Sequence, residues 1–255
     1  MQIAKNTPEV WDKVWSPLSE EEDRYYLDKH RKSIEWARIK SRVLKKFGSF
    51  KGIKSIEIGA GEGLTSLLFA LEGAEVTILD FSPEAIKSSK LFFKRNNIKA
   101  NFILMDALNL DKKLLSKYDV SMSFGTAEHF SGDNRIKFIQ AHFNVLRKDG
   151  ITFISVPNKW NLIYRLWKFL SQSFGRWQFA DEFPFSRAEF RSIGKKLNVK
   201  FDIIGGYLFH SHFLIKRRLR KFFGFNQFPK KVNYEIGTPL DKYFAQTIVA
   251  IAKKD

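Results

Sequence analysis

Apolar residues follow two patterns along most of the chain: short continuous runs, and longer stretches in which they recur every three or four positions. The short runs, bounded by glycine and polar residues, predict buried strands, and the longer stretches predict helices. Strands are expected at residues 53–58, 74–80, 100–105, 120–124 and 150–156, and helices at residues 63–72, 83–96 and 134–146. This alternation predicts an α/β fold, in which a mostly parallel sheet carries helices on both faces.

The two ends of the chain are less regular. Residues 23–47 show helical spacing and predict one helix or a helix pair. Residues 157–185 are crowded with aromatic and basic residues, which we interpret as an insertion over the sheet edge. Ser186 and Glu189 resemble a capping box and predict a helix over residues 186–197. Strands at about 199–209 and 243–252, on either side of a basic stretch at 213–231, would bring the sheet to seven strands.

A length of 255 residues fits one α/β domain, because two separate domains would each be small. We expect a single domain over residues 1–255. It is divided into an N-terminal helical arm (1–48), a ligand-binding core (49–158) and insertions or a cap at 157–185 and 211–235.

The net charge of +17 is large enough to attract nucleic acid, anionic lipid or phosphorylated substrates. A lysine-rich solvated surface is the alternative interpretation. The absence of cysteine excludes disulfides, thiolate metal sites and cysteine nucleophiles. No signal-peptide pattern and no run of about 18 apolar residues is present, so a cytoplasmic protein is expected, and peripheral contact with a membrane stays open.

Candidate chemistry begins with Glu57-Ile-Gly59-Ala-Gly61-Glu-Gly63, which lies between a predicted strand and a predicted helix. Glycines permit a tight turn and a close approach of the backbone to a ligand, and free N–H groups at a helix start favour an anionic group such as a carboxylate. A dinucleotide fingerprint requires another glycine where this chain has Leu64. An NAD-dependent oxidoreductase is therefore the weaker interpretation.

Two acidic residues end the following strands. Asp80 closes the second strand, where a carboxylate can accept both hydroxyls of a ribose, and Met105-Asp106-Ala107 places an acid at the end of the third. The carboxyl ends of parallel strands meet at one edge of a sheet, where open α/β folds bind their ligands. The sequence thus predicts one site for a ligand that contains a nucleoside.

With Leu79-Asp80-Phe-Ser82 and Tyr118-Asp-Val-Ser-Met-Ser-Phe-Gly-Thr-Ala-Glu-His-Phe130, these motifs resemble the class I S-adenosylmethionine-dependent methyltransferases over roughly residues 50–160. The resemblance implies a Rossmann-like sheet, S-adenosylmethionine as cofactor and S-adenosylhomocysteine as product. It also implies a set of cofactor-binding residues: Glu57, Gly59, Ala60, Gly61, Gly63, Asp80, Phe81, Ser82, Asp106, Ala107, Phe124 and Gly125.

Within this set, the resemblance implies that Gly59, Ala60 and Gly61 line the methionine portion, and that Glu57 orients the loop or reaches the amino group. Asp80 is expected to hold the ribose, with Phe81 against the adenine and Asp106 and Ala107 at the adenine edge. Phe124 and Gly125 are expected to provide backbone contacts beneath the methionine. Simple core packing is the alternative role for Phe81.

Glu128 and His129 follow the fourth strand and are the candidate catalytic residues. A histidine with an ordinary pKa near ~6.5 can take a proton from a hydroxyl or amine nucleophile. In the alternative interpretation, Glu128 caps the loop and His129 holds it through hydrogen bonds. No metal is predicted, because the remaining histidines show no ligand spacing with carboxylates; these are His30, His142, His210 and His212.

The expected acceptor is small or lipophilic and is methylated at an O, N or C nucleophile. Trp11, Trp15, Tyr25 and Tyr26 of the arm are expected to form an apolar chamber together with residues 157–185. Residues 213–225 have the pattern of an amphipathic helix that packs on the sheet, covers the pocket as a lid or rests on an anionic bilayer.

Two other functions stay open. The positive net charge agrees with an RNA-directed methyltransferase. Enzymes that methylate exocyclic base amines, however, have an Asp/Asn-Pro-Pro-aromatic motif where this chain has Phe124-Gly-Thr-Ala127. The second is a non-catalytic S-adenosylmethionine-binding module. The sequence leaves the oligomeric state open.

Overall fold

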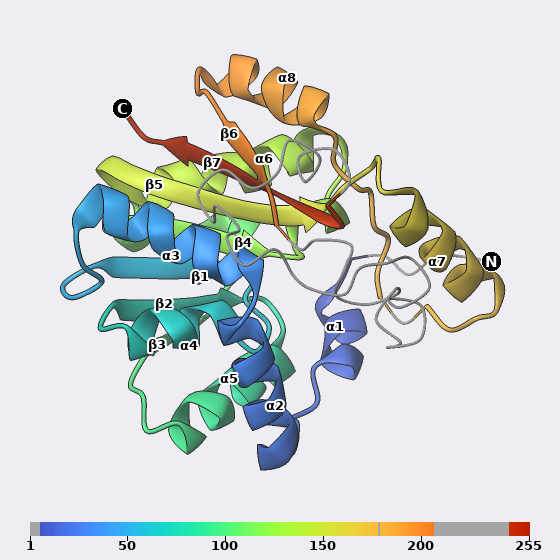
Figure 1. Ribbon diagram of the computed structural model, residues 1–255, viewed down its shortest axis with the longest axis horizontal. Helices are drawn as coiled ribbons and strands as arrows, with labels where there is room; N and C mark the ends of the chain where they lie inside the picture. Colours follow the sequence, from blue (N-terminus) through green and yellow to red (C-terminus); the bar gives the residue numbers. More distant parts are fainter. Residues whose placement is uncertain (1–5, 178, 207–244) are drawn as a thin grey trace, which may run out of the picture.

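The computed structural model describes residues 6–177, 179–206 and 245–255 (Figure 1). Its strands are β1 (Lys54–Ile58), β2 (Glu75–Asp80), β3 (Asn101–Leu104), β4 (Tyr118–Phe124), β5 (Leu146–Pro157), β6 (Asp202–Gly205) and β7 (Thr247–Lys253). Its α-helices are α1 (Pro8–Val14), α2 (Glu20–Arg31), α3 (Ile34–Phe47), α4 (Leu64–Leu71), α5 (Pro83–Arg95), α6 (Gly132–Val145), α7 (Leu162–Ser173) and α8 (Arg187–Leu197). The short 3-10 helices are η1 (Ala107–Asn109), η2 (Lys112–Leu114) and η3 (Ala127–His129).

Within the described residues, seven strands form one sheet in the order β3-β2-β1-β4-β5-β7-β6. Strands β1 to β5 are parallel to their neighbours, and β7 is antiparallel to both β5 and β6. The predicted Rossmann-like, mostly parallel sheet is confirmed. The central strands β1, β2 and β4 are buried along nearly all of their length, as expected for a parallel sheet that is covered on both faces.

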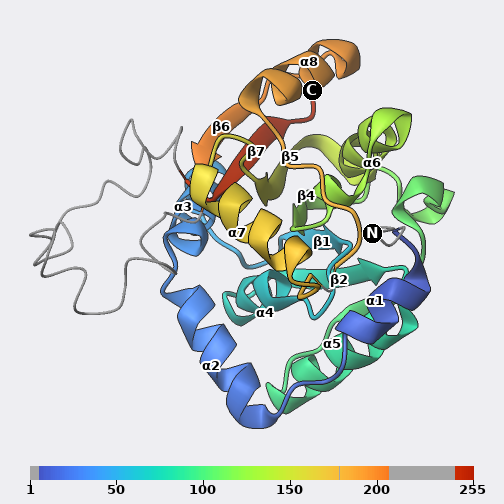
Figure 2. The same ribbon diagram turned by 90° about the vertical axis from the view of Figure 1, so that its right-hand side faces the viewer.

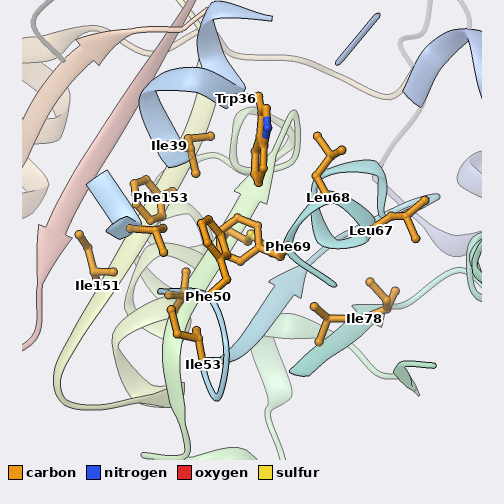
Figure 3. Close-up of a cluster of buried hydrophobic side chains, with 14 of the residues drawn as sticks. Trp36, Ile39, Phe50, Ile53, Leu67, Leu68, Phe69, Ile78, Ile151 and Phe153 are labelled. Carbon is orange, nitrogen blue, oxygen red and sulfur yellow. The ribbon is translucent and has the colours of Figure 1, made fainter. Parts of the chain in front are cut away.

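Each face of the sheet has its own apolar core. Helices α3, α4 and α5 cover one face, where Trp36, Phe50 and Phe69 form an aromatic cluster (Figure 3). Helices α6 and α8 cover the other face, where Phe138 and Phe190 are buried. The predicted helices on both faces are therefore confirmed, and the sheet is a rigid platform for the loops at its ends.

The N-terminal arm contains the expected helix pair, preceded by the short helix α1, which was not predicted. Ser19 and Glu22 form a complete capping box at the start of α2, and the Ser33 hydroxyl accepts a hydrogen bond from the N–H of Trp36 at the start of α3. The carboxylate of Glu35 on α3 accepts hydrogen bonds from the hydroxyls of Ser155 (2.6 Å) and Thr247 (3.2 Å). These buried contacts attach α3 to β5 and β7.

The predicted insertion at residues 157–185 contains α7, a helix that the sequence analysis did not predict. The Ser186 hydroxyl accepts the N–H of Glu189 at 3.1 Å at the start of α8. The return bond of a capping box is not formed, because the Glu189 carboxylate pairs with Arg135 instead. The basic stretch 213–231, the cap 211–235, His210 and His212 lie outside the described residues.

We expect Phe69→Ala to lower the free energy of unfolding by about 3–5 kcal/mol, because it leaves a cavity in the aromatic cluster. Phe69 is fully buried, with ring centroids 5.0 Å from Phe50 and 5.7 Å from Trp36. Leu71→Ala on the same helix is the control, since Leu71 is 42% exposed and should change stability by no more than about 0.5 kcal/mol. Urea denaturation measures both, and equal losses would contradict the proposed core.

Candidate active site

A cavity of about 790 Å³, its open mouth included, lies at the carboxyl ends of β1, β2 and β4. This location is the one at which open α/β sheets bind ligands. Six segments line it: the arm, the β1–α4 loop, the end of β2, the β3–η1 turn, the end of β4 with the loop after it, and helix α6. The lining residues are Asn6, Trp11, Trp15, Gly59, Ala60, Leu79, Asp80, Phe81, Met105, Asp106, Ala107, Leu108, Phe124, Gly125, Thr126, His129, Phe130 and Phe138.

The glycine loop after β1 presents backbone to this cavity. Gly59 and Gly61 have φ values of +66° and +54°, a conformation that side-chain-bearing residues rarely adopt. The N–H groups of Gly59 and Ala60 donate to the carbonyl of Leu79, and the Thr126 hydroxyl donates to the carbonyl of Gly59 at 2.8 Å. A side chain at Gly59 would collide with Thr126. The loop is thereby fixed between β2 and β4.

Asp80 connects the glycine loop to the end of β2. One carboxylate oxygen accepts the N–H of Gly61 at 2.8 Å, and the other accepts the N–H of Ser82 at 2.9 Å. Burial raises the pKa of Asp80, and these backbone hydrogen bonds oppose that shift. A carboxylate has about four lone-pair sites. The backbone hydrogen bonds leave part of these sites unused. Because Asp80 lines the cavity, the unused sites can accept the hydroxyls of a bound sugar.

Glu57 lies beneath the loop and outside the cavity lining. Its carboxylate accepts the N–H of Ser66 at 2.9 Å and the hydroxyl of Ser66 at 2.5 Å, in the first turn of α4. Burial raises the pKa of Glu57 to about 7. Of the two roles considered for this residue, orientation of the loop is the one with contacts in the structure. Gly63 also lies outside the lining and packs on Ile78 at the start of α4.

The far end of the cavity lies over the β3–η1 turn. The Asp106 carboxylate accepts the N–H of Leu108 at 2.9 Å and the side-chain amide of Asn109 at 3.0 Å, which fixes the turn that carries Ala107. Phe81 lines the cavity on the β2 side. An acidic group, an apolar ring and a backbone turn that lines the cavity match what an adenine requires.

Helix α1 lies across the cavity and is attached to α5. The Asp12 carboxylate accepts hydrogen bonds from the Ser82 hydroxyl (2.6 Å) and from the N–H of Glu84 (3.3 Å). The ring of Trp11 meets the His129 ring edge-on at 4.7 Å, and Trp15 lies against Gly61. Figure 2 looks onto this end of the molecule. It shows α1 next to α5, and it shows α7 on the other side of the strand ends.

The expected aromatic chamber is therefore correct in part. Trp11 and Trp15 line the cavity, and Phe179 of the insertion lies 6.4 Å from the Trp11 ring. Tyr25 and Tyr26 are 61% and 43% exposed on α2, and neither lines the cavity, which corrects the expectation for them. The residues that α2 buries are others, such as Asp23 and Leu27.

His129 has one ring nitrogen engaged and lines the cavity with its ring. Its Nδ1 lies 2.8 Å from the carbonyl oxygen of Asp181. Because a carbonyl only accepts hydrogen bonds, Nδ1 carries the proton, and Nε2 keeps its lone pair. Burial lowers the pKa of His129 to about 4, so the ring is neutral at pH 7. The geometry agrees with both interpretations of His129. Through Nδ1 the ring holds residue 181 in place, and Nε2 is the nitrogen that can accept a proton.

Glu128 is buried outside the cavity lining. Its backbone carbonyl accepts the N–H of Phe183 at 2.8 Å, and its Oε2 has no hydrogen-bond partner among the described residues. Burial, followed by the nearby Glu182, raises the pKa of Glu128 well above its usual range. These shifts favour the neutral acid, so the contacts of Glu128 support the loop-holding role over that of a general base.

The structure thus brings most of the sequence-predicted set around one cavity and places the others behind it. The predicted residues that line it are Gly59, Ala60, Asp80, Phe81, Asp106, Ala107, Phe124, Gly125 and His129. Glu57, Gly61, Gly63, Ser82 and Glu128 support the lining from behind. Thr126 and Phe130 line the cavity without having been singled out, although both lie within the motif after the fourth strand.

In the described part of the chain, no group of three or more His, Asp or Glu side chains is arranged to hold a metal ion.

Comparison with known proteins agrees with this geometry. Residues 56–150 match the protein family described as "Methyltransferase domain". The chain is 32% identical over 128 residues to the ubiquinone biosynthesis O-methyltransferase of Pelagibacter ubique (strain HTCC1062), a match that covers 48% of this chain and 51% of the relative. It is 23% identical over 145 residues to that of Bordetella avium (strain 197N), with 57% and 56% covered. The chain thus spans about half the length of the curated relatives it matches.

Solved structures show the same fold. A SAM-dependent methyltransferase from Archaeoglobus fulgidus superposes with a TM-score of 0.57 at 19% identity, over 90% of this chain and 98% of that one. The magnesium protoporphyrin IX methyltransferase of Synechocystis PCC 6803 with bound SAH gives a TM-score of 0.59 at 13% identity, over 97% and 93%. Residues 56–150, which carry most of the loops around the cavity, thus match a methyltransferase domain, and the solved structures with the same fold include S-adenosylmethionine-dependent methyltransferases.

We expect the His129 ring to titrate with a pKa of about 4 and to carry its proton on Nδ1 when neutral. Because this pKa is below the ordinary value of about 6.5, the unfolded chain binds more protons than the native protein between these two pH values. His129 therefore lowers the free energy of unfolding as the pH falls through that window. Two-dimensional NMR of the imidazole nitrogens measures the tautomer and the pKa, and a native pKa near 6.5 would contradict the burial of this ring.

Proposed function

We propose that this protein transfers the methyl group of S-adenosylmethionine to a hydroxyl oxygen of a small, lipophilic, aromatic acceptor. The observation that carries the proposal is the position of His129, a histidine that is neutral at pH 7, in the wall of the cavity that the strand-end loops form. The names of the relatives, ubiquinone biosynthesis O-methyltransferases, support oxygen as the methylated atom. The aromatic side chains around His129 support an apolar, flat acceptor.

The residues of the cavity fit the proposed cofactor in three parts. Gly59 and Ala60 would bring backbone to the methionine portion, with Phe124 and Gly125 beneath it. Asp80 would accept the ribose hydroxyls with the acceptor sites that its backbone hydrogen bonds leave free. Asp106 and Ala107 would hold the adenine edge. Asp80 and Asp106 are already held by backbone and amide hydrogen bonds, so binding orders few further groups.

The cofactor supplies an activated methyl group, whose carbon is bonded to a positively charged sulfur. The chain therefore has to align the acceptor oxygen with the carbon–sulfur bond and to keep water away from it. When bound, the cofactor would supply its methyl carbon to the acceptor oxygen, and the electron pair of the carbon–sulfur bond would stay on sulfur in S-adenosylhomocysteine. His129 Nε2 accepts the hydroxyl proton of the acceptor, and the bond from Nδ1 to Asp181 keeps the ring in the required orientation.

Helix α1 makes two contributions to this proposed reaction. Trp11 covers the His129 ring and separates it from bulk water, and Trp15 covers the glycine loop. The bonds from Asp12 to the start of α5 hold both indoles in place. Since α1 contributes Trp11 to the wall beside His129, it also limits the thickness of an acceptor that can reach Nε2.

We expect Asp80→Ala to weaken the affinity for S-adenosylmethionine by about 1–3 kcal/mol, the scale of a lost hydrogen bond to a charged group. Isothermal titration calorimetry measures the dissociation constant. Asp80→Asn keeps one carbonyl acceptor and should lie between the alanine variant and the parent protein. Asp111→Ala is the control, because Asp111 caps η2 outside the cavity. An unchanged dissociation constant for both Asp80 variants would rule out the ribose contact.

We expect His129→Gln to lower kcat with phenolic acceptors by about 10²- to 10⁴-fold, the usual contribution of a general base, at unchanged affinity for S-adenosylmethionine. The assay follows S-adenosylhomocysteine formation over a panel of phenols, amines and carbon acids. In the parent protein, kcat/KM should show no inflection near pH 6.5, since the pKa of His129 is about 4. If His129→Gln retains full activity, this residue only holds the loop. If the parent protein binds the cofactor but methylates nothing in the panel, the chain is a binding module.

A further inference from the structure

Helix α7 is amphipathic, but its apolar side is turned away from the protein. Leu162, Leu166 and Phe169, spaced by about one helical turn, are 72%, 58% and 64% exposed. The neighbouring apolar side chains are also exposed: Trp160, Ile163, Trp167, Leu170 and Phe174. A surface helix of a globular protein normally buries such a stripe. We call these eight residues the α7 apolar face; it is far larger than the single exposed apolar residues that need no explanation.

The opposite side of α7 fixes this orientation. Tyr164 is the buried residue of the helix, and its hydroxyl donates to the carboxylate of Glu182. The Lys168 ammonium donates to the backbone carbonyl of Glu182 at 2.5 Å and lies 5.0 Å from the ring centroid of Trp177. The polar side of α7 thus holds the helix on the protein. The α7 apolar face is consequently presented to whatever surrounds the molecule.

The charged residues of α7 itself, and of the chain directly before and after it, are all basic. Residues 159–177 contain the basic residues Lys159, Arg165, Lys168 and Arg176 and no aspartate or glutamate. Lys159, Arg165 and Arg176 are exposed at the two ends and along one border of the face. The surface therefore complements a partner that is apolar inside and anionic at its rim. A second copy of the same face would bring like charges together, which is unfavourable.

We propose that α7 docks this protein on the surface of an anionic lipid bilayer, with the helix lying in the plane of the interface. Helices with Trp, Phe and Leu on one side and Lys and Arg beside them bind there, with the apolar side among the acyl chains and the cations at the headgroups. At 12 residues, α7 is much shorter than the roughly 20 residues that a membrane-spanning helix needs. None of the helices in the described part of the chain is long and apolar enough to cross a membrane.

The docked orientation places the cavity on the bilayer side of the molecule. Beyond the end of α7 at Ser173 lie Phe179, whose ring centroid is 6.4 Å from that of Trp11, and Asp181, whose carbonyl oxygen is bound by His129. Both α1 and α7 lie beyond the carboxyl ends of the parallel strands (Figure 1). A lipophilic acceptor dissolved in the bilayer would therefore meet the protein next to the proposed base. This consequence rests on the proposed function, whereas docking itself does not.

The test is flotation of the full chain with vesicles, in the absence of cofactor and acceptor. We expect binding to vesicles of phosphatidylcholine and phosphatidylglycerol in equal parts, and weaker binding to phosphatidylcholine alone. L166E/F169E should lower the partition coefficient by about tenfold or more, since two apolar anchors are lost and charge repulsion is added. The matched control is L71E/L104E, which makes the same change in charge at positions 42% and 56% exposed on α4 and β3 and should bind like the parent protein.

Three results would overturn the proposal. One is failure of the parent chain to bind anionic vesicles, and another is equal binding by L166E/F169E and the parent chain. The third is a dimer of the parent chain in light scattering that L166E/F169E converts to a monomer, because the α7 apolar face would then be a self-interface. Far-UV circular dichroism and a thermal melt confirm that both double variants are folded. A protein that binds vesicles but methylates no acceptor would leave docking intact and contradict only the proposed function.

Discussion

The buried carboxylate of Asp80 is the interaction on which the rest of the site depends. It ends β2, and its two oxygens hold the N–H groups of Gly61 and Ser82, so one side chain fixes the glycine loop and the start of α5 together. Ser82 in turn donates to Asp12, which attaches α1 to the same point. The floor and the cover of the cavity therefore share one anchor.

A second group of contacts organises the other side of the cavity. His129 and Glu128 follow β4, and both hold the segment after α7, through the carbonyl of Asp181 and the N–H of Phe183. The chain thus uses one two-residue turn to orient a ring in the cavity wall and to place the end of the insertion. Helix α7, whose apolar face is turned outward, is joined to the proposed base by a short segment. Membrane docking and acceptor entry would therefore share the same side of the molecule.

The central sheet was predictable because its strands are buried on both faces and appear in the sequence as short apolar runs. The strand ends were predictable for the same reason, since Gly59 and Asp106 directly follow those runs, Asp80 ends one, and His129 lies in the loop after another. Helix α1 was missed: it has seven residues, too few for a reliable helical pattern, and tertiary contacts such as those of Asp12 and Trp11 hold it in place.

The sequence also could not distinguish residues that line the cavity from those that support it. Asp80 ends β2 and Glu57 lies one residue before the end of β1, but Glu57 turns toward Ser66 of α4. Helix α7 was missed although Leu162, Leu166 and Phe169 have helical spacing, because the aromatic and basic residues throughout 157–185 favoured an irregular insertion.

The most direct test of the account is a crystal structure of the full chain with S-adenosylhomocysteine. The account predicts the ribose against Asp80, the adenine between Phe81 and the Asp106 turn, and the sulfur facing His129 beneath α1. A ligand bound elsewhere, or one that makes no contact with Asp80, would contradict it.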